Sequence, residues 1–136
     1  MKGILLIPKT LKEVFQQLDG MFPQKEKDFI TSNPESEMIQ YHHGAGRWIR
    51  NNWNLWAKET NDLKDWFTTL GISHPDDMSG IILDSYWRFK NNKPLELEKQ
   101  AQYYKNYWAK QTTNDDSSWD YTKYARALIE EIRKRS

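Results

Sequence analysis

Apolar residues recur along the chain every three or four positions, which is the spacing of amphipathic α-helices. This spacing predicts helices near residues 11–20, 34–56, 63–70, 75–89, 97–108 and 121–132, with a short charged helix after Pro23. We find no internal repeat and no period-2 strand, although the apolar residues 4–7 would suit one short N-terminal strand. We therefore expect one all-α domain of six to seven helices over residues 1–136.

Helix-capping residues mark several of these boundaries. Thr10 is placed to cap the first predicted helix, and Asn33 followed by Pro34 is a strong start signal for the third. Gly71 is placed as a left-handed C-cap, with Ile72 folding back onto the preceding helix. Ser73 or His74 caps the next helix, whose first turn carries Pro75, Asp76 and Asp77.

The segment YHHGAGRWIRNNWNLW, residues 41–56, follows the Asn33–Pro34 start signal, so we place it on one continuous helix. Steps of about 100° per residue put Met38, Ala45, Ile49, Trp53 and Trp56 on one buried arc, together with His42 and Asn52. The opposite, solvent-facing side then carries His43, Arg47, Arg50 and Asn54. We expect His42 and Asn52 to be polar residues of the core.

The same segment has functional interpretations beside the structural ones. His42 could be a general base or a hydrogen-bonded core histidine. No carboxylate lies on the same arc of the helix, which favours the core histidine. Gly44 and Gly46 resemble a phosphate-binding loop but lie within a helical pattern, which indicates close helix packing. Arg47 and Arg50 beside tryptophans could hold a nucleic acid.

One further cluster could hold a metal ion, namely His74 with Asp76 and Asp77. Helix capping already accounts for all three residues, so we predict no metal site there. The sequence offers no set of catalytic residues and no cofactor motif, and we expect neither an enzyme nor a bound cofactor.

Several apolar side chains fall outside the predicted core faces. Leu83 and Trp87 lie behind the apolar face of their helix, Tyr103 and Tyr107 flank theirs, and Trp119 precedes the last helix. These rings could cover a second packing layer or form a protein-binding surface, because aromatic residues are enriched in interfaces.

Composition narrows the class of partner. The 136 residues include 20 Lys and Arg against 19 Asp and Glu, so no field of one sign favours a nucleic acid or a membrane surface. Cysteine is absent, which excludes disulfides and fits a reducing compartment. The apolar start is shorter than a signal-peptide core, and no run approaches the ~20 apolar residues of a membrane span. We expect a cytoplasmic protein.

Three segments carry a family resemblance. IPKTLKEVFQQLD, MIQYHHGAGRWIRNNWNLW and LGISHPDDMSGIILDSYWRFKNNKP resemble, in order and spacing, a small bacterial domain family of unknown function. The resemblance covers residues 7–94 and leaves residues 95–136 as a C-terminal helical extension. Members of that family look like companions of secreted or contact-delivered bacterial toxins, and the resemblance implies no catalytic residues.

The resemblance therefore implies an immunity protein that neutralises a cognate contact-dependent or other polymorphic toxin, for example a nuclease, through tight binding and occlusion of its active site or substrate. We expect its contacts to include seven residues: Trp87, Tyr103, Tyr107, Asp115, Asp116, Trp119 and Asp120. Nuclease inhibitors often present a strongly acidic face, whereas this chain is nearly neutral and offers only the acids around Trp119. The alternatives are a nucleic-acid-binding module using Arg47 and Arg50, and an enzyme built around His42 or His74.

Overall fold

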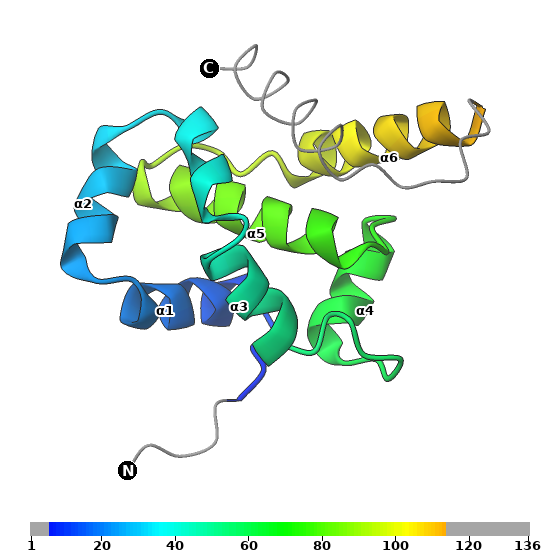
Figure 1. The fold of residues 1–136 in the computed structure, drawn as a ribbon, viewed down its shortest axis with the longest axis horizontal. Helices are drawn as coiled ribbons and strands as arrows, with labels where there is room; N and C mark the ends of the chain where they lie inside the picture. Colours follow the sequence, from blue (N-terminus) through cyan, green and yellow to red (C-terminus); the bar gives the residue numbers. More distant parts are fainter. Residues whose placement is uncertain (1–5, 114–136) are drawn as a thin grey trace.

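The computed structural model describes residues 6–113, which form seven helical elements (Figure 1). In chain order these are α1 (Leu11–Met21), α2 (Gln24–Ser32), the 3-10 helix η1 (Glu35–Tyr41), α3 (Ala45–Asn52), α4 (Asp62–Thr69), α5 (Pro75–Lys90) and α6 (Leu97–Thr113). Residues 6–113 contain no strand, so the predicted all-α class is confirmed. Residues 6 and 7 of the predicted strand 4–7 are therefore not a strand. Residues 4 and 5 and the predicted helix 121–132 lie outside the described residues.

Helix α5 is the centre of the fold. It packs against α1, α2, η1 and α3, and also against α6, so neighbours surround it (Figure 1). Every residue from 76 to 87 is buried in consequence. The prediction that Leu83 and Trp87 lie behind the apolar face is therefore wrong, because a surrounded helix has no solvent-facing side. The Trp87 indole N–H donates to the Asn33 carbonyl oxygen at 2.8 Å.

Large rings supply much of the core, as the aromatic-rich and otherwise polar composition requires. Trp53, Phe67 and Tyr86 are fully buried, and Phe22 stacks on Tyr86 with ring centroids 5.5 Å apart. The Tyr86 hydroxyl keeps a polar partner by donating to Asp19 Oδ1 at 2.7 Å. A buried tyrosine thus contributes apolar area without leaving its hydroxyl unsatisfied.

Most predicted helix ends are confirmed. The Thr10 side chain accepts from the Glu13 N–H, and α5 begins after His74, whose Nδ1 accepts from the Asp76 N–H at 3.1 Å. Gly71 has a φ of +80°, the left-handed conformation that glycine adopts without strain, and it ends α4 as expected. Ile72 then folds back, with its N–H donating to the Phe67 carbonyl oxygen at 3.0 Å.

The continuous helix predicted over residues 34–56 is wrong. The segment forms η1, a turn over residues 42–44, and then α3, because Gly44 adopts φ −94° and ψ −90°, outside the helical region. Asn33 is the C-cap of α2, and its side-chain amide donates to the Phe29 carbonyl oxygen rather than starting a helix.

This turn changes which residues of α3 face the core. The buried positions are Gly46, Ile49, Arg50 and Trp53, which follow helical spacing but with a different phase from the predicted arc. Asn52 and Trp56, both predicted on the buried arc, are exposed, and Arg50, predicted in solvent, is buried. Ile49 and Trp53 are buried as predicted, and the wheel failed for the other positions because it assumed that one helical phase persists through Gly44 and beyond Asn52, where α3 ends.

Candidate functional site

A buried polar cluster joins α3 to the first turns of α5. The Arg50 guanidinium lies 3.3 Å from Asp76 Oδ1 through Nε, and it donates to Ser79 Oγ at 2.7 Å and to the His42 carbonyl oxygen at 3.1 Å. Both charged side chains are only 6% exposed. A buried pair of this kind fixes the relative position of two elements, since breaking it leaves a buried charge unpaired. Arg50 is therefore not available to hold a phosphate group.

His42 is a core residue, as predicted, and lies in the turn between η1 and α3. Burial, followed by the neighbouring Arg50 and His43, lowers the pKa of His42 to about 4, so its ring is neutral at neutral pH. His43 is exposed, as predicted, and meets the His42 ring edge-on at a centroid distance of 5.2 Å. A side chain only 4% exposed does not present itself to a substrate as a general base.

Asn52, the other residue predicted in the polar core, is exposed and its side-chain amide donates to the Trp48 carbonyl oxygen within its own helix. The glycine prediction is correct for one of the two positions. A Cβ on Gly46 would lie 3.0 Å from Arg50 Nη1 and 3.3 Å from the Tyr41 carbonyl oxygen, whereas one on Gly44 would meet nothing within 4 Å. Gly46 thus permits the close packing around Arg50.

Three rings from distant parts of the sequence meet at the surface near the start of α5. The His74 ring stacks on Trp108 with centroids 5.4 Å apart, and Trp56 meets His74 edge-on at 5.7 Å. We call Trp56, His74 and Trp108 the aromatic site. Trp56 is 56% exposed, an unusual position for the largest apolar side chain.

Hydrogen bonds hold two of these rings in place. The Trp108 indole N–H donates to Asp77 Oδ2 at 2.7 Å, and the His74 ring is fixed by its capping bond to the Asp76 N–H. The Asp77 carboxylate is buried beneath Trp108, whereas Asp76 holds His74 through its backbone N–H and uses its carboxylate to pair with Arg50. Asp77, predicted only as a charge in the first turn of the helix, therefore also positions Trp108 of the aromatic site, which sequence reasoning missed.

A hollow of about 370 Å³ adjoins the aromatic site on the side of α6. Its walls include Gly71, Ser73 and Lys105 as well as Trp108. Trp108 belongs to both the aromatic site and the wall of the hollow, so the ring cluster and the depression are continuous on the surface. Such relief suits contact with another protein, in which aromatic anchors and pockets alternate.

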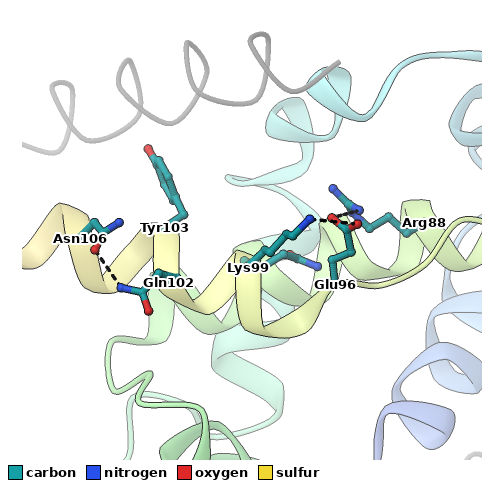
Figure 2. A pocket seen from close by; sticks show the side chains of 7 residues that line it. Arg88, Glu96, Lys99, Gln102, Tyr103 and Asn106 are labelled. Atoms are coloured by element: carbon teal, nitrogen blue, oxygen red, sulfur yellow. Dashed lines mark hydrogen bonds and ion pairs between the residues drawn. The ribbon is translucent and has the colours of Figure 1, made fainter.

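The residues predicted to bind a partner have different fates. Trp87 is buried, with 8% of its surface exposed. Tyr107 is half-buried, and its ring packs edge-on against Trp108 at 5.5 Å, which places it beside the aromatic site. Tyr103 is half-buried and lines a different hollow, near Arg88 (Figure 2). Asp115, Asp116, Trp119 and Asp120 lie outside the described residues.

The described residues form neither a metal-binding cluster nor a membrane-spanning helix. Within residues 6–113, no group of three or more His, Asp or Glu side chains is arranged to hold a metal ion. His74, Asp76 and Asp77 instead serve as cap, ion-pair partner and hydrogen-bond acceptor. Across the same residues, no helix combines the length and the apolar character needed to cross a bilayer.

Comparison with known proteins gives one result. The searches of curated proteins and of solved structures give no match. The model of a family described as "Domain of unknown function (DUF6794)" matches residues 7–90, which run from before α1 to the last residue of α5. The match includes Trp56 and His74 but not Trp108, which lies on α6. Because the model covers more than half of its length, the chain belongs to this DUF6794 family.

Proposed function

We propose that this protein is an immunity protein, which binds a cognate bacterial toxin domain directly and blocks its active site or the approach of its substrate. The observation that carries the proposal is the exposed indole of Trp56, held against His74 and Trp108. The resemblance of the sequence motifs to companions of bacterial toxins supports the class of partner. The activity requires only stoichiometric binding and no catalytic group.

The energetics of Trp56 suit a binding hot spot. A tryptophan side chain offers up to about 250 Å² of surface, and its exposed part here is 56%. Burying about 140 Å² in an interface contributes about 3.5 kcal/mol at roughly 25 cal/mol per Å². Because hydrogen bonds already fix His74 and Trp108, little conformational entropy is lost when a partner covers the aromatic site.

The position of the aromatic site relative to the family match supports a role in partner choice. Trp56 and His74 come from the matched residues 7–90, whereas Trp108 and the neighbouring Tyr107 come from α6 beyond them. A site built in this way joins a family scaffold to a segment that the family model does not describe. We propose that α6 contributes to specificity for one toxin.

The direct test is to co-express the full chain with the toxin domain encoded by the adjacent gene. We expect a 1:1 complex of nanomolar or tighter affinity by isothermal titration calorimetry, together with protection of cells that express the toxin. Trp56→Ala should weaken the complex at least 30-fold, because hot-spot truncations cost about 2 kcal/mol or more.

Phe89→Ala provides the matched control. Phe89 is also an exposed aromatic residue, but it lies at the far end of α5, about 22 Å along the helix from His74. We expect this variant to bind the toxin within about threefold of the wild-type affinity. The absence of any complex would refute the immunity function, and equal weakening by both variants would refute the assignment of the aromatic site.

A further inference from the structure

A second surface feature lies between the end of α5 and the start of α6. Two hollows, of about 300 and 530 Å³, share Arg88, Glu96 and Lys99 in their walls and therefore form one continuous groove. We call it the Arg88 groove. Figure 2 shows the residues that line the smaller hollow. The groove runs from Glu96, just before α6, along that helix to Asn106. This distance is about 15 Å at the helical rise, and it matches the length of four to five residues of extended chain at about 3.3 Å each.

The floor of the groove is rigid because Arg88 is fully engaged. Its guanidinium lies 3.1 Å from both carboxylate oxygens of Glu35, through Nε and Nη2, and Nη1 donates to the Pro94 carbonyl oxygen at 3.1 Å. A two-pronged contact of this type fixes the guanidinium in one plane. Arg88 and Glu35 also neutralise each other, so the charge offered to a ligand comes from the rim.

The rim carries an excess of positive charge. Because Arg88 and Glu35 are paired, the rim is left with Lys93 and Lys99 against Glu96, two positive groups against one negative group. Lys93 is exposed and forms no ion pair with any residue of the described part of the chain. Lys99 is 79% exposed and reaches only Glu96, at 3.6 Å. An exposed pair of this kind is weak, so both ammonium groups can contact an incoming carboxylate at little cost.

The wall of the groove also holds an unsatisfied acceptor. Gln100 is 2% exposed, and its Nε2 donates to Ser85 Oγ at 3.0 Å and to the Leu95 carbonyl oxygen at 2.8 Å. These bonds fix the amide, and its Oε1 has no hydrogen-bond partner within the described residues. Buried acceptors are almost always paired. A main-chain N–H entering the groove would supply the missing donor.

We propose that the Arg88 groove binds a short acidic peptide segment of another protein. The carboxylates of the segment would contact Lys93 and Lys99, and one of its main-chain N–H groups would donate to Gln100 Oε1. Tyr103, further along α6, would cover an apolar side chain of the segment. This inference concerns a surface other than the aromatic site and does not depend on toxin binding.

Fluorescence polarisation with a labelled peptide, Gly-Glu-Glu-Leu-Glu-Glu, tests the proposal at about 50 mM salt, where screening is modest. We expect saturable binding to the full chain and at least tenfold weaker binding of the peptide in which every Glu is replaced by Gln. Nitrogen-15 NMR spectra recorded during the titration should show a shift of the Gln100 side-chain amide signals. Failure of the acidic peptide to bind, or binding without a change at Gln100, would overturn the proposal.

Charge-reversal variants separate the groove from general electrostatic attraction. Lys93→Glu/Lys99→Glu should lower the affinity for the acidic peptide at least tenfold. Lys12→Glu/Lys25→Glu, which reverses the charge of two exposed lysines on α1 and α2, should change this affinity less than twofold. Equal weakening by the two double variants would overturn the proposal. Trp56→Ala should leave peptide binding unchanged, so the outcome is independent of the test of the proposed function.

Discussion

Protonation of His42 should destabilise the fold as the pH falls from neutral, and the size of the effect follows from its environment. Burial and the Arg50 guanidinium lower the pKa of His42 from 6.5 to about 4. The unfolded chain therefore binds a proton on this residue at a higher pH than the folded chain does. Stability has its full value above the unfolded pKa, falls as the pH drops towards 4, and reaches its lower level below the folded pKa.

The full difference amounts to about 3 kcal/mol, since each pKa unit corresponds to about 1.4 kcal/mol. About 2 kcal/mol of it should be lost between about pH 7 and pH 5, where most carboxylates of the folded chain are still ionised. A loss of this size is a large fraction of the typical total stability of a domain. It is measurable by urea unfolding followed through tryptophan fluorescence at several pH values.

Two variants isolate the contribution of His42. His42→Gln, which cannot titrate, should lose about 2 kcal/mol less than the wild type over this pH range, whatever its stability at neutral pH. His43→Gln changes the exposed neighbour and should retain the wild-type pH dependence. If the wild type and His42→Gln show the same pH dependence, the ring is either charged or solvated in the fold, and the reasoning fails.

Further substitutions test the packing around α5. Arg50→Ala should cost about 3 to 5 kcal/mol in chemical denaturation because it leaves the buried Asp76 carboxylate unpaired, and an Arg50→Met/Asp76→Leu double variant should be less destabilised than the single one. Gly80→Ala should cost about 1 to 3 kcal/mol, because its Cβ would lie 2.6 Å from the Tyr104 hydroxyl. Gly20→Ala, where a Cβ meets nothing within 4 Å, should instead increase the free energy of unfolding by about 0.5 to 1 kcal/mol and raise the thermal midpoint slightly. Equal effects at the two glycines would contradict this account of the α5–α6 contact.

The local signals in the sequence were sufficient to predict most helix boundaries. Thr10, Gly71 and His74 act through hydrogen bonds and backbone angles within a few residues of themselves, so their roles can be derived without knowing the fold. The all-α class follows from the spacing of apolar residues for the same reason. The membership of residues 7–90 in a domain family agrees with the resemblance seen in the sequence motifs.

The tertiary structure decided what each side chain contacts. Trp87 is buried because α5 has neighbours all around it, and Arg50 is buried because Asp76, 26 positions along the chain, offers a partner. Neither condition can be recognised from the local spacing of apolar residues, since both depend on segments that meet only after folding. The end of α3 at Asn52 had a similar effect, because Trp56 lies in the turn that follows, where Asn54 has a φ of +54°, and is exposed instead of continuing the buried arc.

The sequence by itself thus determined most of the helices, several of their caps and the family resemblance, because these depend on short-range geometry and on order along the chain. Only the tertiary structure brought Trp56, His74 and Trp108 together and joined the walls of the Arg88 groove. Surface sites of this kind are built from residues far apart in sequence, and their composition is fixed by the packing of helices around α5. That packing minimises exposed apolar area over the whole chain and is not encoded at any single position.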